Sequence, residues 1–119
     1  MRILSITAQK PHSTGSGVYL TELIRNWQDM GCVQAVVAGI YEEDYADFPE
    51  HVKFYPVKFH TAKLPFAITG MSDEMPYEST RYCDLTPDMV GKFRDRFHDV
   101  IEKAVQELEP DLIVCHHLY

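Results

Sequence analysis

The feature that most constrains this chain is a unit near its N-terminus, in which two short apolar runs flank a glycine-containing loop and an amphipathic segment. The runs are RILSIT (Arg2–Thr7) and VQAVVAGI (Val33–Ile40). Both show little polar–apolar alternation, which is typical of strands buried on both faces of a parallel sheet. Residues 18–30 carry apolar side chains at spacings of three and four, which predicts a helix that ends before Gly31. The order strand, helix, strand predicts a right-handed βαβ unit.

The remainder of the chain predicts two more strands and a long helix. Val52–Phe59 alternates as a third strand, and its Pro56 favours an edge position or a break. Residues 86–108 open with Thr-Pro-Asp, a strong helix start, and continue with an apolar stripe at helical spacing. Asp111–Cys115 predicts a fourth, buried strand. We therefore expect an α/β fold: a doubly wound, Rossmann-like domain with a mostly parallel sheet.

Two expectations concern the less regular parts. Residues 60–85 are either a functional loop or lid, or a connection packed by its own side chains, namely Phe66, Ile68, Met71, Met75 and Tyr77. A helix should follow the fourth strand to cover the sheet. We therefore expect residues 1–119 to be a truncated domain at the start of a longer protein.

The charge balance and the cysteines limit the possible partners. Eleven Lys and Arg against eighteen Asp and Glu give a net charge of −7, which disfavours binding to nucleic acid or to an anionic membrane. No apolar stretch approaches the roughly 20 residues that cross a bilayer, and no signal peptide is visible. Three widely spaced cysteines without a CxxC pair favour reduced thiols. We predict a cytoplasmic protein with no nucleic-acid partner and at most weak membrane association.

The first candidate site is the segment Thr14-Gly15-Ser16-Gly17, expected just before the first helix. Glycine lets a backbone approach a ligand closely, and the N–H groups of a helix N-terminus favour an anion such as phosphate. The segment matches neither GxGxxG, because Leu20 replaces the third glycine, nor a P-loop. Gly15, Ser16 and Gly17 are therefore candidate ligand-binding residues, and a simple strand-to-helix turn is the alternative.

The second candidate site is the pair His116 and His117, which follows the fourth strand. Ligands of open α/β sheets bind beyond the carboxyl ends of the strands, where these residues fall. Adjacent side chains on an extended backbone point to opposite sides, so only one of the two is expected to reach a cleft. Such a histidine can donate to a phosphate or a sugar hydroxyl, or act as an acid or base. The alternative is a hydrogen-bonded histidine at a strand end. No metal site is expected, because no further ligands stand at metal-binding spacing.

Three segments together resemble the N-terminal half of retaining glycosyltransferases of the GT-B fold, family four of the nucleotide-sugar-dependent enzymes. Residues 2–31, RILSITAQKPHSTGSGVYLTELIRNWQDMG, resemble the first strand, glycine-pair loop and helix of that family. PDLIVCHHLY resembles its fourth-strand motif, an Asp-led apolar run that ends in histidine. FAITGMSDEMPYEST resembles a stretch found in a bacterial branch.

The resemblance implies two Rossmann-like domains, of which this chain is the acceptor-side one, with the donor-binding C-terminal domain absent. By this resemblance Gly15 and Gly17 approach the donor diphosphate or the acceptor. His116 matches the histidine that contacts the transferred sugar, and His117 is the less favoured match. The family needs no metal or other cofactor. The implied partners are a nucleotide-sugar donor, a glycosyl acceptor and the chain's own C-terminal domain.

The resemblance also bears on activity. The paired glutamates and cationic residues of the second domain lie outside this sequence, so the chain alone should be inactive. We expect it to be able to self-associate through an uncovered sheet edge or cleft face. The acidic charge favours a soluble acceptor over a lipid one. Two alternatives stay open: half of a nucleotide-sugar epimerase, which needs no acceptor, and a non-catalytic Rossmann-like or flavodoxin-like module that binds a nucleotide by itself.

Overall fold

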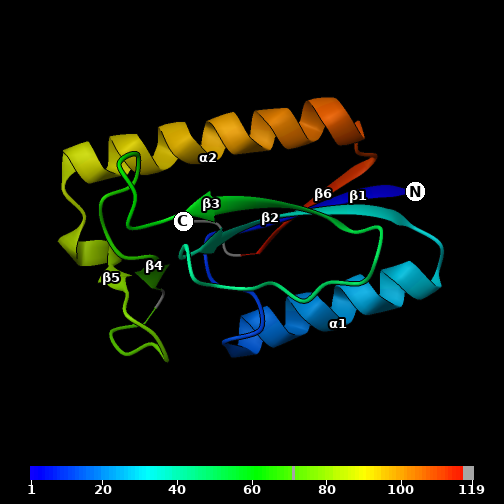
Figure 1. Ribbon diagram of the computed structural model, residues 1–119, viewed down its shortest axis with the longest axis horizontal. Helices are drawn as coiled ribbons and strands as arrows, with labels where there is room; N and C mark the ends of the chain where they lie inside the picture. Colours follow the sequence, from blue (N-terminus) through cyan, green and yellow to red (C-terminus); the bar gives the residue numbers. More distant parts are fainter. Residues whose placement is uncertain (71, 117–119) are drawn as a thin grey trace.

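The structure of the chain, a computed structural model, describes residues 1–70 and 72–116. A parallel sheet lies between two long helices (Figure 1). The strands of this sheet are β1 (Arg2–Thr7), β2 (Val33–Ile40), β3 (Lys53–Lys58) and β6 (Leu112–His116), and the helices are α1 (Gly15–Asp29) and α2 (Pro87–Leu108). Between β3 and α2 lie the short strands β4 (Thr69–Gly70) and β5 (Thr80–Arg81) and the 3-10 helix η1 (Tyr82–Asp84).

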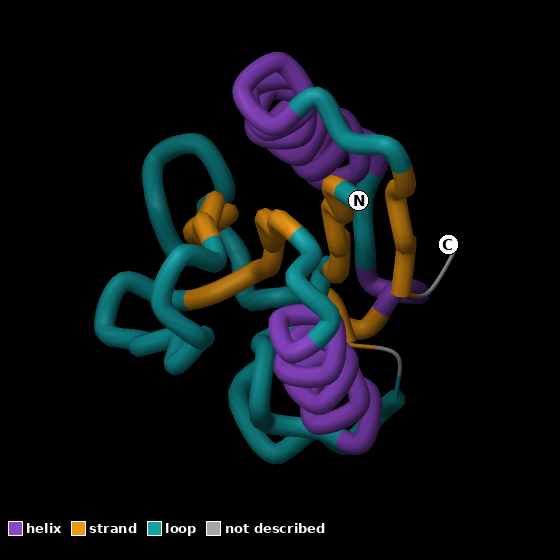
Figure 2. Tube along the Cα trace, turned by 90° about the vertical axis from the view of Figure 1, so that its right-hand side faces the viewer, coloured by secondary structure: helices purple, strands orange, loops and turns teal. Residues whose placement is uncertain are grey.

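The strand order places β1 at a change of direction in the chain. The order is β3-β2-β1-β6, and every neighbouring pair is parallel. The chain thus moves outward from β1 through β2 to β3, then crosses over to place β6 on the other side of β1. Because the two crossovers run in opposite directions, their helices cover opposite faces, as Figure 1 and Figure 2 show. This arrangement confirms the predicted Rossmann-like α/β fold with a parallel sheet.

The core has two layers, one under each helix. On one face, Phe97 of α2 belongs to the same buried cluster as Val37 of β2. On the other face, Leu20 of α1 belongs to a cluster with Val36. Adjacent residues of β2 are therefore buried against opposite helices, which explains why this strand is apolar without alternation.

Both helices begin at a threonine that caps them. The Thr14 hydroxyl accepts a hydrogen bond from the Gly17 N–H at 3.1 Å, so α1 begins at Gly15, three residues before the predicted start. Gly31, beyond the end of α1, has the positive φ of 79° that the sequence suggested. The Thr86 hydroxyl caps α2 in the same way, and the predicted bounds of this helix are confirmed.

The prediction that the fourth strand is buried on both faces is wrong. Leu112 and Ile113 of β6 are 43% and 46% exposed, and Cys115 is exposed as well. Helix α2 packs over β1, β2 and β3, and α1 packs over β2, so both helices lie toward the opposite side of the sheet. Within the described residues β6 is also an edge strand, with β1 as its one neighbour.

The irregular segment between β3 and α2 packs into the core through its own apolar side chains. Leu64, Phe66 and Ile68 are buried in the cluster beneath α2, and Tyr77 packs against it. The Phe66 ring meets Phe59 edge-on, with 5.8 Å between the ring centroids. This packing agrees with the second of the two interpretations, a connection held by its own side chains. Met71, one of the side chains named for it, lies outside the described residues.

A pair of glycine substitutions tests how tightly the loop after β1 is packed on the sheet. A Cβ at Gly39 would lie 2.4 Å from the Ala8 carbonyl oxygen, whereas a Cβ at Gly91 of α2 meets nothing within 4 Å. We expect Gly39→Ala to lower the free energy of unfolding by about 1–3 kcal/mol or more. Gly91→Ala should raise it by about 0.5–1 kcal/mol. Urea unfolding followed by circular dichroism measures both, and equal midpoints for the two variants would contradict the prediction.

Candidate functional site

The candidate site lies at the carboxyl edge of the sheet, where the strand order reverses. Thr7 and His116, the last residues of β1 and β6, are partners in the parallel register. The chain leaves β1 toward α1 on one face, and it reaches β6 from α2 on the other. In open α/β sheets the loops on the two sides of such a switch point diverge and leave room for a ligand.

The first turn of α1 presents backbone N–H groups at this edge. Gly15, Ser16 and Gly17 belong to the helix rather than to a preceding loop, because Thr14 caps it. The Gly17 N–H is used by that cap, whereas in the described part of the chain the N–H groups of Gly15 and Ser16 have no hydrogen-bond partner. A Cβ at Gly15 would meet nothing within 4 Å. Gly15 and Ser16 are therefore able to donate to an anion, and the space beside Gly15 is open.

Gly17 has a different role, because it faces the chain's own loop. A Cβ at this position would lie 2.9 Å from the backbone nitrogen of His12 and 3.0 Å from the carbonyl oxygen of Lys10. Its lack of a side chain lets residues 10–12 pass against the helix. Glycine is therefore required at position 17 because the loop that borders the site packs directly against the helix there.

His116 lies beside the start of α1. Its ring meets the ring of Tyr19 edge-on at 6.2 Å between centroids. The side chain of His116 is half-buried, and Tyr19 is 60% exposed. The end of β6 therefore lies beside the first turns of α1, the helix that begins with the first candidate segment. His117, the fourth predicted ligand-binding residue, lies outside the described residues.

His12 takes part in the architecture of this edge, although no partner for it could be predicted from the sequence. Its Nε2 accepts a hydrogen bond from the Asp47 N–H at 3.1 Å, so Nδ1 carries the proton and donates to the Thr21 hydroxyl at 2.8 Å. That hydroxyl donates to the Gly17 carbonyl at 2.9 Å. The pKa of His12 is lowered from 6.5, mainly by burial. The nearby Asp47 charge raises the pKa and the Arg25 charge lowers it further. A polar Thr21 on the buried face of α1 was the only local signal.

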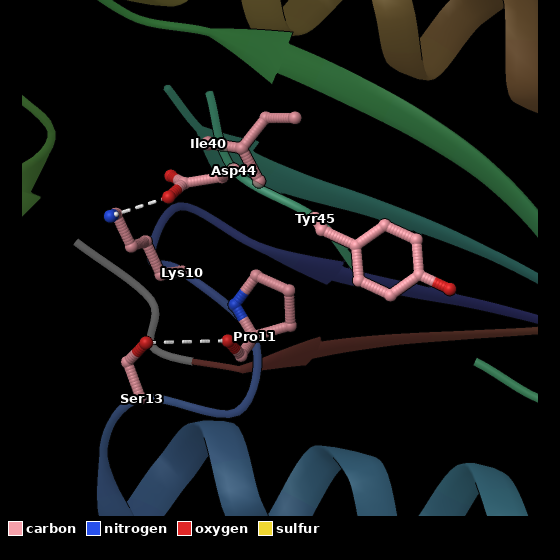
Figure 3. A pocket seen from close by; sticks show the side chains of 6 residues that line it. All are labelled: Lys10, Pro11, Ser13, Ile40, Asp44 and Tyr45. Atoms are coloured by element: carbon pink, nitrogen blue, oxygen red, sulfur yellow. Dashed lines mark hydrogen bonds and ion pairs between the residues drawn. The ribbon is translucent and has the colours of Figure 1, made fainter. Parts of the chain in front are cut away.

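Lys10 joins three loops at the carboxyl edge. Its ammonium lies 2.9 Å from the Asp44 carboxylate (Figure 3), and 4.6 Å and 4.9 Å from the ring centroids of Tyr41 and Tyr77. The Lys10 and Asp44 side chains are only 15% and 21% exposed. The second oxygen of Asp44 accepts from the Tyr41 N–H at 2.7 Å. This pair therefore ties the loop after β1 to the loop after β2 and to the irregular segment.

The two tyrosines next to Lys10 remain neutral phenols at neutral pH. Burial raises the pKa of Tyr41 and of Tyr77. The Tyr41 hydroxyl donates to the Glu78 carbonyl oxygen and accepts from the Ile68 N–H at 3.0 Å. The irregular segment is thus hydrogen-bonded to the loop after β2 at two points.

Within residues 1–70 and 72–116, no group of three or more His, Cys, Asp or Glu side chains could hold a metal ion. No helix in that part of the chain is long and apolar enough to cross a bilayer. Comparison of the chain with protein-family models and with curated proteins finds no match.

The Lys10–Asp44 pair can be tested by a double-mutant cycle. Lys10→Met keeps the packing of the side chain but leaves a carboxylate with little access to water, so the free energy of unfolding should fall by about 1–3 kcal/mol. Lys10→Met combined with Asp44→Asn should recover part of this loss, because the unpaired charge is gone. Denaturant unfolding of the four proteins measures the coupling. Strictly additive changes would contradict the pairing.

The state of His12 predicts a pH dependence of stability. Because the pKa of His12 is lowered in the folded state, the unfolded chain binds this proton more readily. The free energy of unfolding should therefore fall as the pH drops from about 6.5 toward the lower pKa of the folded state. His12→Asn, which tolerates the positive φ of 70° at this position, should reduce that slope. Urea unfolding between pH 5 and pH 8 measures the effect, and identical slopes would refute it.

Proposed function

We propose that this chain is the acceptor-side domain of a GT-B-fold retaining glycosyltransferase, which transfers a sugar from a nucleotide-sugar donor to an acceptor. The observation that carries the proposal is the contact between Tyr19 of α1 and His116 at the end of β6. It brings the helix N-terminus and a histidine together at the switch point of a parallel sheet. The sequence resemblance points to the same two segments.

The proposed roles follow from the chemistry of each group. The N–H groups of Gly15 and Ser16 donate to a phosphate oxygen or to an oxygen of the acceptor. His116 donates to, or accepts from, a hydroxyl of the transferred sugar. Tyr19 limits the rotation of the His116 ring through their edge-on contact. Such groups orient the sugar but do not neutralise the departing diphosphate.

Neutralisation of the leaving diphosphate is proposed to come from cationic side chains of a second, donor-side domain. The acidic chain described here, with a net charge of −7, is poorly suited to bind a diphosphate alone. The proposed enzyme therefore needs both domains, and no metal is required in this scheme.

A second candidate function is a nucleotide-binding module without catalysis. The N–H groups of Gly15 and Ser16, unpaired within the described residues, favour this alternative. Isothermal titration of the chain with nucleoside diphosphates separates the two proposals. Micromolar binding by the chain alone favours the module, and no binding favours the half-enzyme. An epimerase is distinguished by its product, because it converts the nucleotide sugar without an acceptor.

The transferase proposal predicts a specific loss in the complete enzyme. His116→Ala should lower kcat by at least about 100-fold, because a contact to the reacting sugar is lost, while the unfolding midpoint stays close to that of the parent protein. His98→Ala is the matched control, since His98 lies on the exposed face of α2 with 72% of its side chain exposed. Release of the nucleoside diphosphate reports the activity. Near-normal turnover of His116→Ala would contradict the proposed role of His116 in transfer.

A further inference from the structure

A small pocket at the carboxyl edge is separate from the contact between Tyr19 and His116. It has a volume of about 50 Å³ and lies between the loop after β1 and the loop after β2. Its lining residues are Lys10, Pro11, Ser13, Ile40, Asp44 and Tyr45 (Figure 3). This volume admits a hydroxyl or hydroxymethyl group but not a whole sugar ring. A ligand that enters it must therefore lie mostly outside, against the rim.

The electrostatics of the pocket disfavour an anion. The Lys10 ammonium is already paired with Asp44 at 2.9 Å, and two tyrosine rings cover it. The loop after β2, to which Asp44 belongs, carries further carboxylates at Glu42, Glu43 and Asp47. The Lys10–Asp44 pair is close to neutral overall, so it does not attract a cation strongly either. These features favour a neutral ligand that donates hydrogen bonds.

Hydrogen-bonding capacity remains at the pocket wall. The Asp44 carboxylate receives one hydrogen bond at each oxygen, from the Lys10 ammonium and from the Tyr41 N–H. A carboxylate has about four lone-pair sites, so each oxygen can accept from one more hydroxyl. Its 21% exposure leaves it accessible from the pocket side. The exposed Ser13 hydroxyl donates a long hydrogen bond of 3.5 Å to the Pro11 carbonyl oxygen and adds a second polar group.

The rim carries an exposed aromatic ring. Tyr45 is 85% exposed, the most exposed of the large apolar side chains described. In Figure 3 its ring and the Lys10–Asp44 pair lie on opposite sides of Pro11. The face of an aromatic ring carries negative partial charge and attracts the weakly positive C–H groups of a sugar ring. A ring that contributes so little to the core is available for such a contact.

We propose that this pocket is a subsite for a neutral sugar, which places one ring face on Tyr45 and inserts a hydroxyl group that donates to Asp44. One part of this proposal rests on the proposed function: that the sugar bound here is the acceptor of the transfer. Lys10 holds the Asp44 carboxylate in place, and Pro11 and Ile40 form the apolar wall. The subsite thus makes the acceptor a carbohydrate rather than a lipid or a phosphorylated molecule.

Direct binding to the chain tests the subsite without any transfer assay. ¹⁵N-labelled chain is titrated with methyl α-glucoside, methyl α-mannoside and methyl α-galactoside, and with glucose 1-phosphate as the anionic probe. We expect at least one methyl glycoside to shift the amide signals of Asp44 and Tyr45 in the millimolar range. Glucose 1-phosphate should bind more weakly than methyl α-glucoside, because the Asp44 carboxylate lines the pocket and the Lys10 ammonium is already paired with it.

Two variants separate the aromatic contact from general effects on the fold. Tyr45→Ala should weaken glycoside binding by about threefold to tenfold, the range of an aromatic contact, while Tyr45→Phe retains the binding. The exposure of Tyr45 means that neither variant should change the unfolding midpoint. No shift at Asp44 and Tyr45 with any glycoside, unchanged binding by Tyr45→Ala, or tighter binding of glucose 1-phosphate overturns the proposal.

The two proposals fail in different ways. If glycosides bind at Tyr45 but the complete enzyme consumes no nucleotide sugar, the transferase function is wrong and a sugar site remains. If the enzyme transfers sugar in a manner that depends on His116, but Tyr45→Ala changes neither glycoside binding nor the acceptor KM, the subsite is wrong and the transferase function stands.

Discussion

The ammonium group of Lys10 has little access to water, and the geometry of the whole carboxyl edge depends on its partners. Asp44 neutralises it, and the rings of Tyr41 and Tyr77 cover it. These partners belong to different segments, so one cation fixes the relative positions of three loops. Tyr41 extends the arrangement through its hydrogen bonds to Ile68 and Glu78. The pocket walls are thereby held in place before any ligand enters.

A second network supports the start of α1. The chain of hydrogen bonds from Asp47 through His12 and Thr21 to the Gly17 carbonyl connects the loop after β2 to the first helix. The missing side chain of Gly17 lets residues 10–12 lie directly against this helix. The open N–H groups of Gly15 and Ser16 are thus presented by a turn that is held from both sides.

The fold could be predicted largely from local patterns. The apolar run of β2, interrupted only by Gln34, and the Thr-Pro-Asp start of α2 each encode their element within a few residues. The predicted start of α1 at residue 18 is too late, because Gly15 and Gly17 are not typical of a helix. The first turn is identified by the hydrogen bond of its Thr14 cap. The exposure of Leu112 and Ile113 depends on the position of the two helices over the sheet. This position cannot be predicted from a local sequence pattern.

The candidate site was predictable only in part, for the same reason. The meeting of the first helix and the fourth strand follows from the rule for parallel sheets, so His116 and Gly15 could be named from the sequence. Lys10 and Asp44 are separated by 34 residues, and His12 and Asp47 by 35, without any spacing rule that connects them. Such pairs are fixed by tertiary packing of loops. The sequence therefore indicated the edge but not the network that shapes it.

The position of β1 between β2 and β6 also has a consequence for the order of folding. Pairing with β2 closes a short loop through α1, whereas pairing with β6 joins Arg2 to Asp111, 109 residues apart. The entropy cost of closing a loop rises with its length, and contacts of long sequence separation slow folding. The β1–α1–β2 unit can therefore form early, during synthesis, while β6 is added late. The edge that carries His116 forms only when β6 docks against β1.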